Sequence, residues 1–184
     1  NGATYLDQVV IGLDRASEAE YRHALQYFQQ LKIPHTVIWN DGPRIQNLQN
    51  RLKEQGLAPT ELGKGCNVWY CFGFIQSLPH IEAVALHDCD IITYDRALLA
   101  RLLYPVANPR FSYQFCKGFY ARVADGKLNG RVSRLLVSPL VRAMKRGFNN
   151  HPFLYYLASF RYPLAGEFAM RVDVVKTLRI PSDW

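Results

Sequence analysis

The 184-residue sequence lacks the features that define several common classes of protein. No apolar run reaches the roughly 18 residues that suggest a membrane-spanning helix, so we expect a soluble protein. The four cysteines (Cys66, Cys71, Cys89 and Cys116) show no C-x-x-C pair and no zinc-like spacing. Three of them lie inside hydrophobic segments, which indicates buried thiols in a reducing compartment, and we therefore expect a cytoplasmic location.

Acidic residues are scarce in one part of the chain. Residues 101–150 hold ten basic side chains and one acidic side chain, a charge of +9, whereas the whole chain has a net charge of +7. This block predicts an anionic partner, which would be a nucleic acid, a membrane surface or a phosphorylated small molecule. The chain is also 49% hydrophobic and 13% aromatic, which is typical of a globular domain and excludes disorder and a fibrous fold.

The first half of the sequence alternates β-rich runs with helical patterns. Ser17 and Glu20 form a capping box that opens a helix reaching residue 31. The full order of expected elements is strand 7–14, helix 17–31, strand 35–39, helix 44–55, helix 66–77 and strand 83–87. Strands and helices in this order imply right-handed crossovers and a mostly parallel sheet with helices on both faces. We therefore predict a single α/β domain with a Rossmann-like fold.

The second half follows a different pattern. The expected elements are helix 94–103, extended chain 111–123, helix 133–145 interrupted at Pro139, a strand or helix at 155–161, and helix 168–177. No repeat, low-complexity segment or linker divides the chain.

Two acidic residues follow the strand predicted at residues 83–87. Side chains two apart on a strand point the same way, so Asp88 and Asp90 should both project beyond the carboxyl edge of the sheet. Open α/β sheets bind ligands at this edge, and paired carboxylates suit Mg²⁺ or Mn²⁺, which would in turn hold a diphosphate. The alternative is an ordinary polar strand end in which one aspartate caps the next helix.

Two glycine-containing segments suit the binding of an anion. Lys64 stands between two glycines just before a helix, where a phosphate or a sugar can approach closely, although the full phosphate-loop motif is absent and an NTPase is disfavoured. Residues 130–133 (Gly130, Arg131, Val132 and Ser133) combine a guanidinium with a hydroxyl at an expected helix N-cap, a set that suits a phosphate or a carboxylate. A turn lysine and a simple N-cap are the alternatives.

Glu167 is a lone acid among apolar and small residues. It can orient sugar hydroxyls or act as a base, or it can be a carboxylate at a helix start. The histidines have no partner at metal-ligand spacing, and we interpret His80, His87 and His151 as structural.

Taken together, these segments resemble the glucosyl-3-phosphoglycerate synthase group of retaining GT-A glycosyltransferases. The shared motifs occur in family order: VIGLD at 10–14, GKG at 63–65, DCD at 88–90, GRVS at 130–133, SPL at 138–140 and GEFA at 166–169. The resemblance implies a GT-A fold that binds a nucleotide-sugar, with UDP-glucose as the expected donor. It also implies transfer of the sugar to 3-phosphoglycerate with retention of the anomeric configuration.

The resemblance assigns roles to individual residues. Asp14, Lys64 and Asp88 would bind the donor, Asp90 would hold Mg²⁺ or Mn²⁺ together with Asp88, and Gly130, Arg131, Val132 and Ser133 would bind the acceptor. Glu167, on the transferred sugar, and Asp90 would be the catalytic residues. Residues 1–92 would form the donor-binding half and residues 93–184 the acceptor-binding half.

The sequence departs from the family pattern at a few places. Ser133 stands where the family usually has Thr, and Ala165 replaces the first glycine of its Gly-Gly-Glu motif. The family's first strand would precede Asn1 and a metal-ligating histidine would follow Trp184, so we expect the chain to lack both.

Other functions stay open at this point. The first is a mannosyltransferase of the same fold with a GDP donor, and the second is a non-catalytic GT-A remnant that serves binding or assembly. The third is a nucleic-acid-binding module in which the basic block presents aromatic side chains for stacking (Phe111, Tyr113, Phe115, Phe119 and Tyr120). Nucleic acid is not the expected partner, and a homodimer is an expected assembly.

Overall fold

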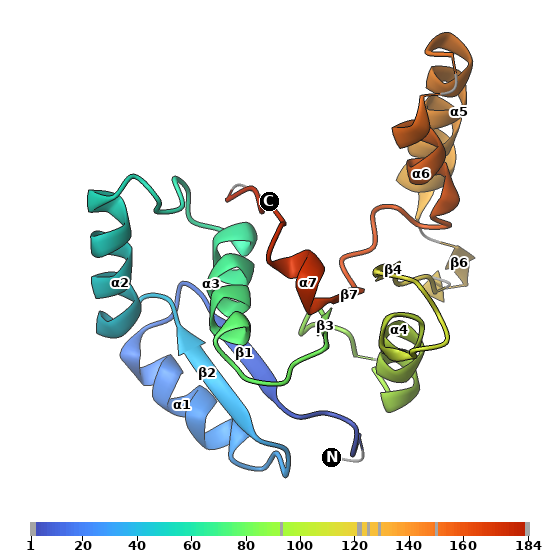
Figure 1. Cartoon of the computed structure of the whole chain (residues 1–184). Coiled ribbons are helices and arrows are strands. Elements are labelled where there is room, and N and C mark those ends of the chain that lie inside the picture. The colour runs from blue at the N-terminus through green and yellow to red at the C-terminus, as the bar shows by residue number, and fades with distance from the viewer. Residues whose placement is uncertain are drawn as a thin grey trace. The chain divides into compact units, whose positions relative to one another are not determined.

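The computed structural model describes residues 3–92, 94–120, 123–124, 126–128, 130–149 and 151–182. The chain forms two compact units, shown in Figure 1. Unit 1 comprises residues 1–82 and 172–184, and unit 2 comprises residues 83–171. Unit 1 is therefore discontinuous: in the sequence, the residues of unit 2 come between its two segments.

Unit 1 contains a two-stranded parallel sheet with helices packed against it. Its elements are β1 (Val9–Leu13), α1 (Glu18–Phe28), β2 (His35–Trp39), α2 (Pro43–Glu54), α3 (Lys64–Gln76) and α7 (Val172–Val175). The strands pair from Val9 with His35 to Leu13 with Trp39. Helix α3 packs against β1, and α1 packs against β2. Because the strands are parallel, their carboxyl ends meet at one edge of this sheet.

The predicted capping box at the start of α1 is confirmed. The Ser17 hydroxyl accepts a hydrogen bond from the Glu20 backbone N–H, and the Glu20 carboxylate accepts one from the Ser17 N–H at 2.7 Å. At the end of β2, the Trp39 ring stacks on Tyr21 with 4.8 Å between ring centroids. Its indole N–H also donates to the Ala16 carbonyl at 2.7 Å. The start of α1 is thus fixed to the carboxyl end of β2.

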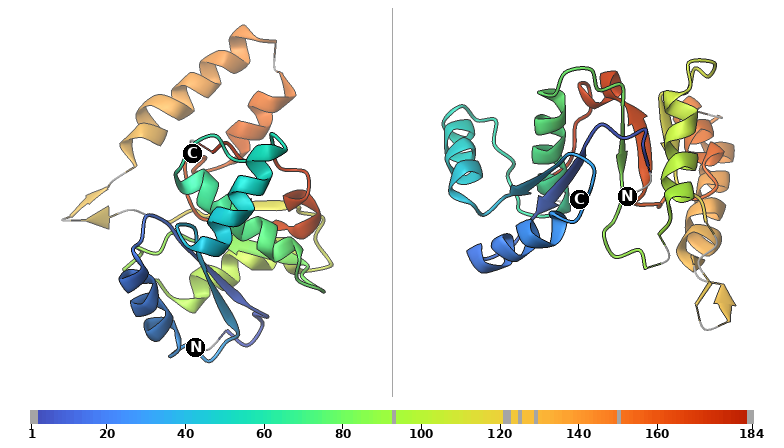
Figure 2. Two further views of the ribbon diagram at one scale, coloured as in Figure 1. Left: turned by 90° about the vertical axis from the view of Figure 1, so that its left-hand side faces the viewer. Right: turned by 90° about the horizontal axis from the view of Figure 1, so that it is seen from below.

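Unit 2 is built on a three-stranded antiparallel sheet. Its elements are β3 (Ala83–Leu86), α4 (Arg96–Ala107), β4 (Phe115–Lys117), β5 (Val123–Ala124), β6 (Lys127–Leu128), η1 (Ser133–Val137), α5 (Ser138–Gly147), α6 (Pro152–Ser159) and β7 (Phe168–Arg171). Strand β7 lies between β3 and β4, and β5 pairs with β6. Helix α4 packs against all three strands of the larger sheet (Figure 2). Leu102, Val106 and Ala169 form a buried cluster between them.

The sheet differs from the prediction in one respect. In the described residues β1 and β2 form the one parallel pair, whereas β3 pairs antiparallel with β7, from Ala83 with Arg171 to Leu86 with Phe168. A mostly parallel central sheet that includes residues 83–87 is therefore the wrong arrangement for these residues. The coarser prediction, an α/β protein with a small parallel sheet and helices, is confirmed.

The helix predicted over residues 168–177 is also wrong in its first part. Phe168, Ala169 and Met170 are 7%, 0% and 1% exposed and form strand β7, while α7 begins only at Val172. A short continuous apolar run is consistent either with a buried strand or with a buried helix segment, because period alone does not separate them. The neighbouring strands β3 and β4 decide the outcome, since they supply backbone partners on both sides.

The helix interrupted at Pro139 is present, and the interruption is a π-helical segment. In η1 the Ser138 backbone N–H donates to the Ser133 carbonyl five residues back, and α5 then starts with Pro139 in its first turn. Proline has no N–H and its ring crowds the carbonyl four residues earlier, so a wider turn accommodates it. Residues 155–161, predicted as strand or helix, lie largely in α6, which packs against α5. Within the described residues, no helix is both long and apolar enough to span a membrane.

Candidate functional site

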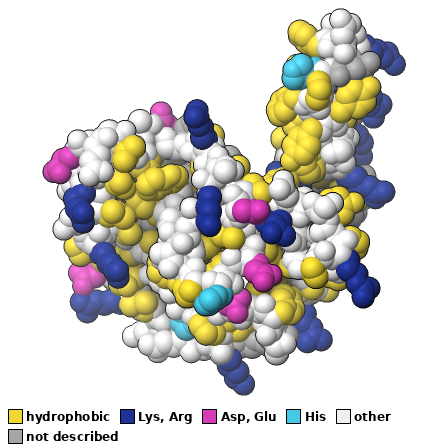
Figure 3. All heavy atoms as spheres, in the orientation of Figure 1, with side chains coloured by type: hydrophobic (Ala, Val, Ile, Leu, Met, Phe, Trp, Pro, Cys, Tyr) yellow, Lys and Arg dark blue, Asp and Glu magenta, His cyan; other side chains and the backbone are white. Residues whose placement is uncertain are grey.

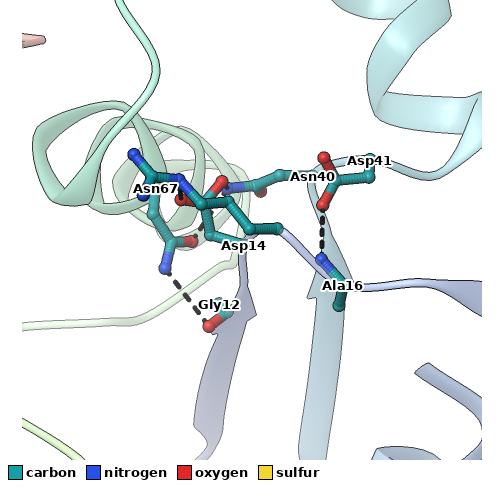
Figure 4. A network of polar contacts seen from close by, with 7 residues as sticks. Gly12, Asp14, Ala16, Asn40, Asp41 and Asn67 are labelled. Carbon is teal, nitrogen blue, oxygen red and sulfur yellow. Dashed lines mark hydrogen bonds and ion pairs between the residues drawn. The ribbon is translucent and has the colours of Figure 1, made fainter. Parts of the chain in front are cut away.

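Polar side chains converge at the carboxyl edge of the β1–β2 sheet (Figure 4). The Asn40 amide, which follows β2 and is 5% exposed, donates to the Asn67 side-chain oxygen at 3.1 Å and to Asp14 at 3.4 Å. The Asn67 amide donates to the Gly12 carbonyl at 3.2 Å. The side-chain oxygen of Asn40 is buried without a hydrogen-bond partner. These contacts bring Asp14 to the first turn of α3.

The electrostatics of this edge are set by Asp14. Its side chain is 19% exposed and lies 3.9 Å from the Arg15 guanidinium, which is itself largely exposed. Burial raises the pKa of the Cys66 thiol in α3, and the charge of Asp14 raises it further. The charge of Asp14 therefore acts on the first turn of α3, which begins within the glycine–lysine–glycine segment.

Lys64 is the first residue of α3, and its side chain is exposed. Gly63 is the N-cap and supplies no side-chain hydrogen bond, so the first backbone N–H groups of α3 have no side-chain cap. Gly65 is required for another reason: a Cβ at this position would collide with the Pro181 carbonyl. The helix start thus offers an exposed cation beside backbone donors, which is the arrangement expected for a phosphate.

Asp88 and Asp90 follow β3, but they do not lie on it. The strand ends at Leu86, Asp88 is half-buried, and Asp90 is exposed in the following turn. The expectation that strand alternation aligns the two carboxylates is therefore wrong. No group of three His, Cys, Asp or Glu side chains comes together as a metal site in the residues that the structure describes. Two carboxylates fit a Mg²⁺ or Mn²⁺ ion that shares its remaining positions with water and phosphate oxygens.

Glu167 lies immediately before β7 and is 2% exposed. Its backbone carbonyl accepts a hydrogen bond from the Gly118 N–H at 2.8 Å, and its Oε2 atom is buried with no hydrogen-bond partner in the part of the chain that the structure describes. The alternative of a helix-start carboxylate is wrong, because the residue precedes a strand. A buried carboxylate oxygen without a donor is unfavourable, so this position is suited to a ligand that supplies a hydroxyl or an N–H group.

His87 is the residue between β3 and Asp88. Both of its ring nitrogens are buried without hydrogen-bond partners, and Tyr94 packs edge-on against the ring with 5.0 Å between centroids. Burial lowers the pKa of His87, and the nearby charges of Glu167 and Asp88 oppose this shift. The interpretation of His151 as structural fits its place at the start of α6, where its ring accepts a hydrogen bond from the Phe153 N–H at 3.3 Å.

Residues 130–133 form the beginning of the helical segment that continues into η1 and α5. Gly130 has a φ of +85°, a backbone conformation that glycine adopts without strain, and Arg131 and Val132 are exposed in the first turn. Ser133 is not the predicted N-cap, because the helical residues begin before it. It is 4% exposed and its hydroxyl oxygen has no hydrogen-bond partner.

The surface of the basic block carries apolar as well as charged side chains. Figure 3 shows hydrophobic and Lys or Arg side chains side by side on α5 and α6. Among the aromatic residues proposed for stacking, Phe115 packs against the rings of Phe160 and Phe168, with 5.9 and 5.6 Å between centroids. Phe111 packs against Tyr104 at 5.6 Å. These two rings are engaged within unit 2.

Comparison with known proteins relates the chain to enzymes that make a glucosylated product. Two curated relatives match it over nearly its whole length, and both are named glucosyl-3-phosphoglycerate synthase. The relative from Persephonella marina is 46% identical over 180 residues, which are 98% of this chain and 44% of that protein. The relative from Methanococcoides burtonii is 44% identical over 187 residues, covering 100% of this chain and 46% of that protein.

These similarities confirm the predicted resemblance to the glucosyl-3-phosphoglycerate synthases. The chain spans less than half the length of the two curated relatives. No family model and no solved structure matches it.

Three polar residues at these sheet edges were not predicted as site residues from the sequence. Asn40 and Asn67 are single amides without a motif, although each stands where a ligand edge is expected, directly after β2 and in the first turn of α3. His87 precedes the DCD motif and was interpreted as structural. The available signal was the position next to a strand end for Asn40 and His87, and the position at a helix start for Asn67.

Proposed function

We propose that this chain is part of a glycosyltransferase that moves a glucosyl group from UDP-glucose to 3-phosphoglycerate. The observation that carries the proposal is the 44–46% identity to two glucosyl-3-phosphoglycerate synthases over nearly the whole chain. The expected reaction retains the anomeric configuration and depends on Mg²⁺ or Mn²⁺. A GT-A fold is part of the proposal, and the small parallel sheet with its helices is compatible with it.

Asp14, Lys64 and Asp88 would bind the donor. Asp14 and Lys64 stand at the sheet edge and helix start suited to a nucleotide. Asp90, with Asp88, would hold the divalent cation. When bound, the cation supplies positive charge that stabilises the departing diphosphate.

The sugar and the acceptor would be bound by residues of unit 2. The buried Oε2 atom of Glu167 can accept a hydrogen bond from a hydroxyl of the transferred sugar. Arg131, exposed at a helix start, can form two parallel hydrogen bonds with the phosphate or carboxylate of 3-phosphoglycerate. Gly130, Val132 and Ser133 would complete the acceptor site.

The state of the cysteines supports a location in a reducing compartment such as the cytoplasm. All four are free thiols, and none pairs with another. Persistent free thiols are typical of proteins that stay in the cytoplasm.

The proposal is tested by calorimetric titration of UDP-glucose with Mn²⁺ or with EDTA. We expect binding with the cation and little binding without it, because two carboxylates repel a diphosphate unless a cation lies between them. Asp90→Asn should weaken binding in Mn²⁺ by about tenfold or more, which is about 1.4 kcal/mol. Asp7→Asn, the same change at an exposed aspartate before β1, is the matched control and should bind as wild type does.

Other outcomes would redirect the proposal. Equal binding in EDTA contradicts the cation assignment, and preference for GDP-mannose selects the mannosyltransferase. Binding of a nucleotide-sugar without turnover of 3-phosphoglycerate indicates a different acceptor or a non-catalytic chain. A strongly salt-dependent affinity for oligonucleotides, with no response to UDP-glucose, indicates the nucleic-acid-binding module.

A further inference from the structure

Buried polar atoms without partners gather at one edge of the β3–β7–β4 sheet. The Oε2 atom of Glu167 and both ring nitrogens of His87 are buried and have no hydrogen-bond partner among the described residues. Buried polar atoms of native proteins are paired in the large majority of cases, so unpaired atoms on two neighbouring residues indicate a missing ligand. The side chain of Glu167 is 2% exposed, and its Oε2 atom has no partner among the residues that the structure describes.

The strand register brings the two residues near each other. Leu86 pairs with Phe168 at the end of the β3–β7 ladder, and His87 and Glu167 are the next residues on the two neighbouring segments, just beyond the last paired position. The charge of Glu167 also acts on the His87 ring, as expected for neighbouring side chains.

Gly118 is the backbone neighbour of the Glu167 carboxylate. Gly118 continues β4, and its N–H holds the Glu167 carbonyl at 2.8 Å. A Cβ at Gly118 would stand 3.2 Å from the Glu167 Cβ and 3.8 Å from its Oε2. Glycine at this position therefore keeps side-chain atoms away from the unpaired oxygen. On the other side, the ring of Tyr94 packs edge-on against His87 and restricts the orientation of the imidazole.

The chemistry of the two residues suits adjacent hydroxyl groups. A carboxylate accepts a hydrogen from a hydroxyl, and an imidazole carries at least one N–H in either charge state, so it can donate to a hydroxyl oxygen. A hexose ring presents neighbouring hydroxyls that each donate one hydrogen bond and accept others. A single apolar or purely anionic ligand would leave part of this set unsatisfied.

We infer that His87 is a second sugar-binding residue, which together with Glu167 binds hydroxyl groups of the transferred hexosyl ring. The inference rests on the proposed function, because it takes the sugar of the nucleotide-sugar as the ligand. Tyr94 is a positioning residue that acts through the His87 ring.

Calorimetric titration of UDP and of UDP-glucose, both with Mn²⁺, separates the sugar from the nucleotide. His87→Phe keeps an aromatic ring against Tyr94 and removes both nitrogens. We expect this variant to lose about 3- to 10-fold in affinity for UDP-glucose and to bind UDP as wild type does. His23→Phe, the same change on the exposed surface of α1, is the matched control.

A second measurement uses the folded wild-type chain. The ring resonances of His87, assigned by their loss in His87→Gln, should shift when UDP-glucose is added and shift much less with UDP. This measurement decides the matter if His87→Phe does not fold.

Four results would overturn the inference. Unchanged affinity of His87→Phe for UDP-glucose, or an equal loss for UDP and UDP-glucose, excludes a sugar contact. Ring resonances that respond equally to UDP and UDP-glucose do the same. A wild-type chain that binds neither ligand overturns the proposed function, and the present inference with it.

Discussion

Gly12 shows how one small residue sets the distance between a strand and a helix. A Cβ at this position would collide with the Asn67 side chain and stand 2.7 Å from the Cys71 sulfur, so only glycine lets α3 lie this close to β1. The close approach allows the Asn67 amide to reach the Gly12 carbonyl. The polar network around Asp14 therefore depends on a missing side chain.

We expect Gly12→Ala to destabilise the protein by about 1–3 kcal/mol, the usual cost of overpacking. Urea unfolding followed by tryptophan fluorescence measures the effect, because Trp39 and Trp69 both lie in unit 1. Gly73→Ala is the matched control: this position is exposed within α3 and a Cβ there meets nothing within 4 Å. The control should be stabilised by up to about 1 kcal/mol, since alanine favours helix more than glycine. Equal stability of Gly12→Ala and wild type would contradict the close approach.

Single residues were the hardest features to predict from the sequence. The capping box at Ser17 and Glu20 was predictable because its partners are three residues apart, and it is confirmed. Asn40 and Asn67 are 27 positions apart in the sequence and meet only through tertiary packing. His87 comes near Glu167 only through the pairing of β3 with residues 168–171, which were predicted as a helix.

At the level of elements, the helix that contains Pro139 determines how residues 130–133 are presented. Gly130 turns the chain into the helix with a φ of +85°, Arg131 lies on the exposed side, and Ser133 is turned inward. The sequence predicted a helix with an interruption, because a proline inside a helical pattern kinks or breaks the helix. The misplaced N-cap shows the limit of such reasoning, since helix ends shift by a turn without a large change in pattern.

Arg131→Lys should weaken binding of 3-phosphoglycerate by about ten- to a hundredfold. The reason is that an ammonium cannot reproduce the planar fork of a guanidinium, and a charge-assisted hydrogen bond contributes about 1.5–3 kcal/mol. Calorimetry with 3-phosphoglycerate measures the change, and Arg134→Lys, an exposed arginine in η1, is the matched control. If Arg131→Lys binds the acceptor as wild type does, residues 130–133 are not the acceptor site.

At the scale of the whole molecule, the four thiols differ sharply in accessibility. Cys89 is exposed between the two aspartates of the DCD motif, whereas Cys66 is 1% exposed. Burial raises the pKa of Cys71 to about 11 and also raises the pKa of Cys116. Because the thiolate is the reactive form, a raised pKa slows the reaction of these thiols at neutral pH.

We therefore expect iodoacetamide at pH 7.5 to label Cys89 first, with the other cysteines much slower. UDP-glucose with Mn²⁺ should slow the labelling of Cys89 several-fold, because the proposed cation and diphosphate would cover the DCD turn. Mass spectrometry of digests taken over time gives the rate for each cysteine, and UDP-glucose in EDTA is the control. If UDP-glucose with Mn²⁺ leaves the rate of Cys89 labelling unchanged, the nucleotide binds away from this turn.

The order of motifs along the chain predicted the relationship to the synthases better than it predicted the sheet. Short motifs such as GKG and DCD can be recognised in the sequence without knowing how the neighbouring strands pair. The resemblance was therefore predictable from the sequence, and it is confirmed. The pairing of β3 with β7 joins segments about 80 residues apart, and no local pattern specifies such a partner.

The discontinuity of unit 1 has a consequence for the order in which the protein folds. Residues 83–171 are continuous in sequence and contain the described strands of unit 2. The strand partners of this unit are therefore all present once these residues have been synthesised. Unit 1 does not, because the Gly65 backbone packs against Pro181 and Thr60 bonds to Ser182, a contact that spans 122 residues. Closing so long a loop costs entropy that short-range contacts do not. The start of α3, where Lys64 stands, therefore reaches its final packing only after residues 83–171 of unit 2 and the second segment of unit 1 have been synthesised.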